Sequence, residues 1–133
     1  LYFQIKPKIN MKKSFILFFV MLLAITVHAQ EADSIALLSP VEFKTQIEHG
    51  SVQLIDVRTP EEFQEGHIEG ALNIDFYSED FEKEFHKLDK EQPVYLYCRS
   101  GYRSNQSAIK LKEMGFKDVY DLEGGILNYN QED

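Results

Sequence analysis

The sequence contains one cysteine, Cys98, among its 133 residues. A single cysteine excludes a disulfide within the chain and a metal site built from several cysteines. Cys98 is therefore an inert buried thiol, the partner of another molecule's thiol, or a reactive group. We expect no metal ion and no cofactor.

Basic residues are also scarce, with 14 Lys and Arg against 22 Asp and Glu and a formal net charge of -8. Four of the bases and none of the acids precede residue 30, so residues 30–133 carry 10 bases against 22 acids. Binding to nucleic acid or to anionic membranes depends on clustered Lys and Arg, so neither partner is expected. The hydrophobic content of 44% suffices for one domain but not for two.

No apolar run reaches the roughly 20 residues that a membrane span needs. The longest run, residues 15–27, follows the cationic start at residues 11–13 and ends shortly before Ala29. This pattern predicts a signal peptide over residues 11–29, with a membrane anchor as the alternative. Residues 1–10 resemble an expression-tag remnant or a mis-set translation start. We expect an exported domain over residues 30–133, periplasmic if the source has two membranes.

Helix-like and strand-like segments alternate along residues 30–133. Helices are predicted over residues 40–48, 60–63, 79–88 and 104–114, and strands over residues 52–57, 93–98 and 119–122, with an edge strand within residues 67–74. Ser39 and Thr59 each precede a proline and a glutamate, which is typical of a capped helix start. Gly115 suits a left-handed helix end. The alternation predicts an α/β domain with a mainly parallel sheet covered by helices on both faces.

Cys98 ends one of these strands, and ligands of open α/β sheets bind at the carboxyl ends of the strands. The loop at residues 99–103 can turn its backbone N–H groups inward, and the next helix adds the positive end of its dipole. Helix N-termini and arginines favour the nucleophilic thiolate. Arg99 and Arg103 would also attract an anionic, sulfur-bearing substrate.

A purely structural interpretation stays open for the same residues. An isolated cysteine is often a small buried hydrophobe. Arg99 and Arg103 can be solvated surface charges, and Ser100 can be a turn residue. For Ser104, a helix N-cap is the favoured interpretation.

Five segments resemble the rhodanese homology domains, in the order and at the separations of that family. They are LIDVR at 54–58, EEF at 61–63, GHIEGA at 66–71, CRSGYRS at 98–104 and DLEGGI at 121–126. The resemblance implies a three-layer α/β/α domain with a mainly parallel five-stranded sheet. It also implies a sulfurtransferase. Cys98 would take sulfur from an anionic donor such as thiosulfate or polysulfide, hold it as a persulfide, and pass it to cyanide or to a thiol, including a protein thiol.

The resemblance assigns roles to the neighbouring residues. Backbone amides would hold the persulfide, contributed by Arg99, Ser100, Gly101, Tyr102, Arg103 and Ser104. The side chains of Arg99 and Arg103 would orient the oxyanion of the donor, and Tyr102 would shape the entrance. Asp56 and Arg58 would support the loops beside the site, with an ion pair to Glu62 or Glu65. His67 is expected to be a turn residue. At position 129 many relatives have tryptophan, and we expect the tyrosine found here to change only the packing.

Three other functions remain open at this point. Phosphatases and arsenate reductases share the fold, but their active-site loop is one residue longer. A non-catalytic binding module of the same fold is a second alternative. A third is sulfur delivery in the cell envelope, for which an external thiol would be needed because the chain has no second cysteine.

Overall fold

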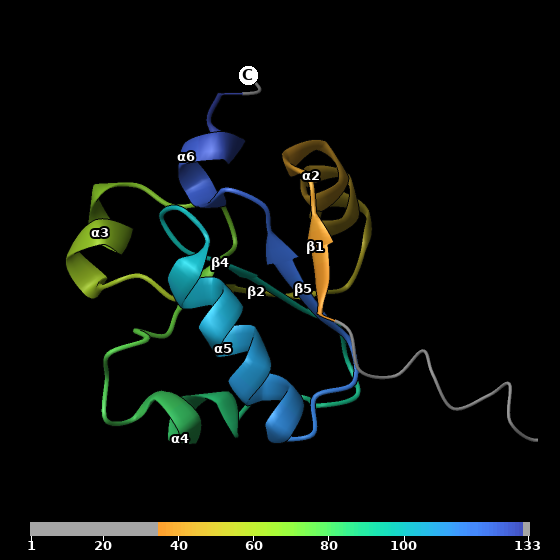
Figure 1. Ribbon diagram of the computed structural model, residues 1–133, viewed down its shortest axis with the longest axis vertical. Helices are drawn as coiled ribbons and strands as arrows, with labels where there is room; N and C mark the ends of the chain where they lie inside the picture. The colour runs from red at the N-terminus through yellow and green to blue at the C-terminus, as the bar shows by residue number, and fades with distance from the viewer. Residues whose placement is uncertain (1–34, 132–133) are drawn as a thin grey trace, which may run out of the picture. The chain divides into compact units, whose positions relative to one another are not determined.

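The computed structural model describes residues 35–131, and five parallel strands form one sheet within them (Figure 1). The strands are β1 (Ala36–Leu38), β2 (Gln53–Asp56), β3 (Leu72–Asn73), β4 (Val94–Tyr97) and β5 (Val119–Leu122), in the spatial order β1-β5-β4-β2-β3. The predicted leader, residues 1–10, and the predicted signal peptide, residues 11–29, lie outside the described residues. The predicted α/β class with a parallel five-stranded sheet is confirmed.

Helices cover both faces of this sheet, which gives three layers. They are α2 (Pro40–His49), α3 (Pro60–Glu65), α4 (Phe81–Phe85), α5 (Tyr102–Glu113) and α6 (Gly125–Tyr129). Side chains of β4 alternate between two cores, because successive residues of a strand face opposite sides. Leu96 packs with α4 and α5, whereas Tyr95 and Tyr97 pack with α2 and α6. Every residue of β4 is buried, as its apolar sequence predicted.

The helix starts follow the sequence signals closely, with one exception. Ser39 and Thr59 both form complete capping boxes. Gly115 has a positive φ of 92° after the end of α5, as predicted. The prediction for the start of α5 is wrong, because its N-cap is Gly101 rather than Ser104. Strand β1 was not predicted from its short apolar run.

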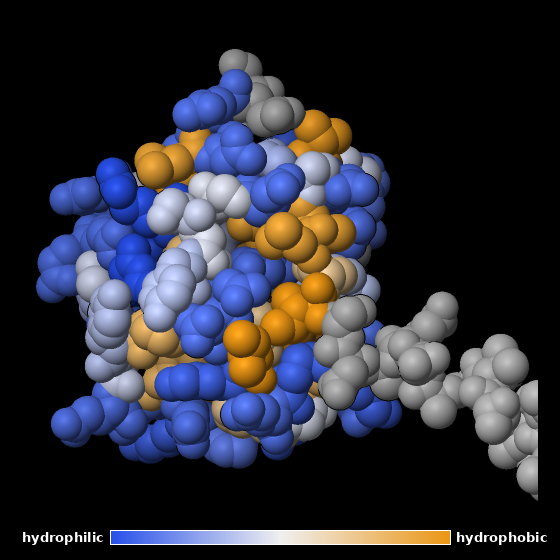
Figure 2. All heavy atoms as spheres, in the orientation of Figure 1, coloured by the Kyte–Doolittle hydropathy of each residue, from blue (hydrophilic) through white to orange (hydrophobic). Residues whose placement is uncertain are grey.

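Polar side chains dominate the face that α5 presents, with smaller apolar areas between them (Figure 2). The large apolar side chains that are exposed on the molecule include Leu37, Ile109 and Leu127. Within residues 35–131, no helix combines the length and the apolar character that a membrane span requires.

Candidate functional site

Cys98 lies directly after β4, at the carboxyl end of the sheet, and its side chain is 1% exposed. The backbone N–H of Gly101 donates a hydrogen bond to its Sγ over 3.1 Å. The hydroxyl of Ser104, from the first turn of α5, lies 3.4 Å from the same Sγ. Two hydrogen-bond donors of the loop and of α5 are thus directed at the sulfur.

The first turn of α6 fixes this loop from the other side. The amides of Ile126 and Leu127 donate to the carbonyl oxygens of Cys98 and Arg99 over 2.9 and 3.2 Å. Gly125 permits this approach, because a Cβ at this position would lie 2.4 Å from the Arg99 carbonyl. Its φ of 66° is also one that glycine adopts readily. The carbonyl groups of Cys98 and Arg99 are thereby bonded to α6.

Arg103 forms a two-pronged ion pair with Glu62 of α3. The two N–O distances are 2.7 and 2.9 Å, and the side chains are 14% and 27% exposed. The hydrogen bond from Arg103 is the main reason why the pKa of Glu62 falls from its ordinary 4.5 to about 2. In turn, the hydrogen bond to Glu62 raises the pKa of Arg103, and the nearby Cys98 adds a smaller contribution. A permanent positive charge therefore lies close to the sulfur.

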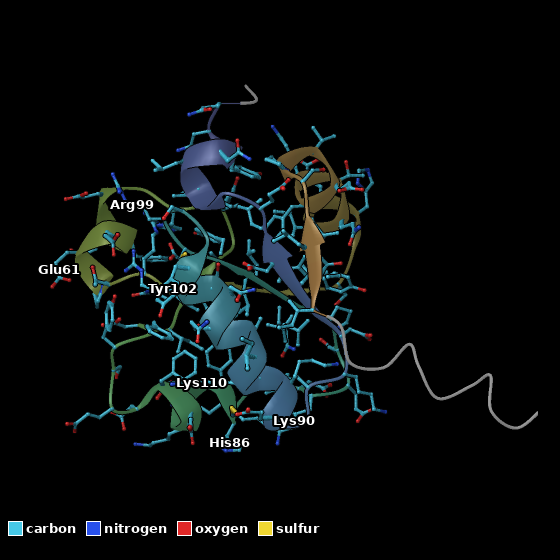
Figure 3. All side chains as sticks on the ribbon, viewed as in Figure 1. Glu61, His86, Lys90, Arg99, Tyr102 and Lys110 are labelled. Carbon is cyan, nitrogen blue, oxygen red and sulfur yellow. The ribbon has the colours of Figure 1, made fainter. Side chains whose placement is uncertain are left out.

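Arg99 and Tyr102 carry the large exposed side chains of the loop region. Tyr102 is 71% exposed and begins α5, while Arg99 extends toward the space between α3 and α6 (Figure 3). Arg99 also borders a cleft of about 830 Å³. Other residues on its lining include Arg58, Glu65, His67 and Leu127. Cys98 does not line this cleft, which therefore lies beside the sulfur.

Asp56 and Arg58 form a closed, buried pair with each other. Arg58 bonds the carboxylate of Asp56 through Nη2 at 2.7 Å and Nε at 3.0 Å, and donates to the Gly66 carbonyl at 2.6 Å. The expected pairing of these residues with Glu62 or Glu65 is wrong. Asp56 is fully buried and forms an ion pair with the guanidinium group of Arg58, while Glu62 forms an ion pair with Arg103.

The two serines of the loop differ in position. Ser100 is exposed, whereas Ser104 is fully buried. Because α5 begins at Tyr102, Ser104 lies in the first turn of the helix instead of capping it. Its hydroxyl donates to the Gly101 carbonyl at 3.2 Å and also faces the sulfur. The correction thus moves Ser104 from a capping role to a contact with Cys98.

His67 lies in the irregular connection between α3 and the turn at residues 69 and 70. Its ring stacks on Phe63 with the centroids 3.7 Å apart. Its Nδ1 lies 2.9 Å from the Phe63 carbonyl oxygen. These contacts attach the ring to α3.

The sequence did not predict the contacts that two acidic residues make near the site. Glu62 was recognised as a helix-cap residue, but its pairing with Arg103 spans 41 residues of sequence and leaves no local signal. Asp121 is 1% exposed and lies within β5. Its signal was an acid between the apolar residues Tyr120 and Leu122 of a predicted strand.

Comparison with known proteins identifies relatives of this arrangement. The family model of the rhodanese-like domain matches residues 39–132. A thiosulfate sulfurtransferase of Shewanella oneidensis is 34% identical over 94 residues, which cover 71% of this chain and 91% of that protein. A tRNA uridine(34) hydroxylase of Cytophaga hutchinsonii is 38% identical over 98 residues, or 71% of this chain and 31% of that protein. The chain thus spans about a third of the length of that hydroxylase.

A solved structure supports the same conclusion about the fold. The crystal structure of a rhodanese-related protein from Thermoplasma volcanium superposes with a TM-score of 0.64 at 25% identity. The match covers 73% of this chain and 92% of that one. The α/β arrangement predicted from the sequence motifs is therefore confirmed.

Proposed function

The chain belongs to the rhodanese-like domain family, and from this we propose that it is a sulfurtransferase that carries sulfur as a persulfide on Cys98. The main supporting observation is the hydrogen bond of 3.1 Å from the Gly101 amide to the Cys98 Sγ. An amide aimed at a sulfur at the carboxyl end of a parallel sheet suits a nucleophile better than a core residue. The thiosulfate sulfurtransferase among the relatives supports the same reaction class.

The transfer proceeds in two displacements. The thiolate of Cys98 attacks the outer sulfur of thiosulfate, the S–S bond of the donor breaks, and its electron pair leaves with sulfite. The outer sulfur remains as the persulfide Cys98–S–S⁻. Cyanide or an acceptor thiolate then attacks that sulfur, and the thiolate of Cys98 is released. With one cysteine in the sequence, the acceptor comes from outside the chain.

The two arginines have different parts in this scheme. Arg103 is engaged by Glu62, so it supplies a fixed positive charge that stabilises the thiolate and the persulfide. Arg99 is exposed at the rim of the loop and meets the oxygen atoms of the incoming donor. The loop amides, with Gly101 foremost, hold the transferred sulfur. Tyr102 borders the entrance.

Sulfur loading is the direct test. The protein is incubated with thiosulfate, and its intact mass is measured before and after addition of cyanide. We expect a gain of one sulfur atom that cyanide removes and that Cys98→Ser lacks. If neither thiosulfate nor polysulfide produces this adduct, the domain is a non-catalytic binding module.

Phosphatase chemistry is not favoured, because the arginine of the loop is already bonded to a carboxylate. Arg103 would have to leave Glu62 to grip a phosphate. The hydroxylase activity of the longer relatives is not extended to this chain either. The chain spans about a third of their length, and the acid surplus of residues 30–133 opposes RNA binding.

Export is part of the proposal and stands on the sequence pattern of residues 11–29. The expected mature N-terminus is Gln30. Sequencing the N-terminus of the protein recovered from the periplasm of a two-membrane host tests this. A product that retains residues 11–29 in the membrane would instead favour an anchor.

A further inference from the structure

Asp121 is a buried acid that the sulfur transfer described above does not use. Its neighbours in β5, Tyr120 and Leu122, contribute to the core on one face of the sheet, so its own carboxyl group faces α5 on the other. Within residues 35–131, its Oδ1 is the one buried side-chain nitrogen or oxygen that lacks a hydrogen-bond partner. A buried oxygen left unpaired costs free energy, which suggests a functional reason for this acid.

The contacts of Asp121 lead to the sulfur. Its carboxyl group interacts with the side chains of Ser104 and Asn105 on α5. The Ser104 hydroxyl in turn lies 3.4 Å from the Sγ of Cys98. A serine hydroxyl has one hydrogen, for which the Gly101 carbonyl oxygen at 3.2 Å, the sulfur and the carboxylate are alternative acceptors. The carboxylate competes as a charged acceptor only when Asp121 is ionised, so the protonation state of Asp121 shifts where that hydrogen points.

We infer that Asp121 is a positioning residue whose protonated form directs the Ser104 hydroxyl hydrogen toward the sulfur of Cys98. A protonated carboxyl donates to the Ser104 oxygen and leaves the serine hydrogen to the sulfur and the Gly101 carbonyl. An ionised carboxylate accepts that hydrogen instead and adds a second negative charge near the thiolate. The inference rests on the proposed function, because it assigns a regulator to the same sulfur.

The electrostatic surroundings allow Asp121 to change state near neutral pH. Burial raises its pKa to about 6, although the contacts with Ser104 partly offset this rise. The residues that face the carboxyl or pair with its strand position are uncharged: Leu37 of β1, Leu96 of β4, and Ser104 and Asn105 of α5. The charge that acts on the sulfur is that of Arg103, which is held by Glu62 and stays ionised in this range.

The test is the pH dependence of Cys98 alkylation by iodoacetamide, followed by intact mass. Asp121→Asn is neutral at every pH and keeps a donor for Ser104. We expect its alkylation midpoint to lie about one pH unit below that of the wild type, the size expected for one charge-assisted hydrogen bond. The matched control is Asp118→Asn, which removes the same charge at an exposed position before the other end of β5 and should leave the midpoint unchanged.

The route through the hydroxyl is tested with Ser104→Ala. Above about pH 6 the ionised Asp121 already draws the hydroxyl hydrogen away from the sulfur, so this variant alone should leave the midpoint near that of the wild type. In its background, Asp121→Asn should lose at least half of its effect. An unchanged midpoint in Asp121→Asn overturns the inference. So does a shift of equal size with and without the hydroxyl, because the acid would then act on the sulfur directly through space.

Two further points keep the outcome decisive. If Asp121→Asn does not unfold cooperatively, Asp121→Ser, which is also neutral and a donor, is judged by the same criteria. Alkylation requires only a thiol, so failure of sulfur loading would refute the proposed function without affecting this result. Conversely, normal loading together with unaltered alkylation profiles would refute only the inference about Asp121.

Discussion

Two arginine–carboxylate pairs flank the carboxyl ends of β2 and β4, and they differ in burial and in sequence range. Asp56 and Arg58 are 0% and 8% exposed, lie two residues apart, and are closed off by the Gly66 carbonyl. Arg103 and Glu62 are 14% and 27% exposed and lie 41 residues apart. The first pair fixes the backbone of a neighbouring loop. The second leaves a positive charge next to the sulfur of Cys98. The same two residue types thus support the backbone in one place and supply a charge in the other.

The largest effect is expected where the buried pair is broken. Arg58→Ala leaves the Asp56 carboxylate buried without its partner, and removing one partner of such a pair typically costs about 3–5 kcal/mol of unfolding free energy. Urea denaturation measures this loss. Arg58→Lys keeps the charge but not the fork of donors, so its unfolding free energy should lie between those of the wild type and Arg58→Ala. A loss under about 1 kcal/mol for Arg58→Ala would show that this pair is not structural support.

A glycine-to-alanine exchange tests how firmly the sulfur loop is held. In Gly125→Ala the new Cβ would lie 2.4 Å from the Arg99 carbonyl, at a positive φ of 66°. We expect a loss of about 3 kcal/mol in urea denaturation, together with slower sulfur loading. The control is Gly70→Ala, with φ 84° but no atom within 4 Å of the Cβ, for which about 1 kcal/mol is expected. Equal losses in both variants would mean that contact with the loop is unimportant.

The half-exposed pair is expected to matter more for rate than for stability. Arg103→Gln removes the positive charge beside Cys98, and sulfur loading should slow by about tenfold to a hundredfold. Unfolding free energy should fall by only about 1 kcal/mol, because the pair is partly solvated. Lys110→Gln is the control, since it removes a charge from the same helix (Figure 3). Its position lies seven residues from Arg103, which corresponds to about two helical turns. Comparable slowing in both variants would contradict a local role for Arg103.

The smallest effect is the pH dependence of the same pair. Its partner Glu62 has a pKa of about 2 in the folded protein against an ordinary 4.5. A lowered carboxyl pKa stabilises the fold fully above pH 4.5, and this contribution is lost as the pH falls toward 2. The stability difference between wild type and Glu62→Gln, about 1 kcal/mol after solvent screening, should therefore shrink over this range. The exposed neighbour Glu61, on the outer side of α3 (Figure 3), supplies the control Glu61→Gln, which removes a carboxylate from the same helix and leaves the pair with Arg103 intact.

Local signals predicted most of the fold. The capping boxes at Ser39 and Thr59 are complete within four residues of sequence, so their hydrogen bonds could be anticipated from residue type and spacing. Strand β4 was recognisable from its run of apolar residues, which suits a strand buried on both faces, and all four of its residues are buried. The three-residue β1 was not, because so short a run is compatible with many structures.

The site was predictable in its centre but not in its surroundings. Cys98 and the following loop could be recognised from the motif and from their place after a strand. The partners of the loop come from distant segments: Glu62 from α3, Ile126 from α6 and Asp121 from β5. No spacing rule connects residues so far apart, so neither the pairing of Glu62 with Arg103 nor the place of Asp121 behind the loop could be predicted. The error over Arg58 is of another kind, because its partner Asp56 lies only two residues away.

The sequence alone determined the class of fold, the family, and the single cysteine on which the proposed function depends. These depend on periodicity, on capping chemistry and on an ordered set of short segments, all of which are local properties of the chain. Only the tertiary structure decided which arginine is engaged, which serine faces the sulfur and which buried acid stands behind it. Those choices depend on distances between segments that become neighbours only when the parallel strands align their carboxyl ends along one edge of the sheet.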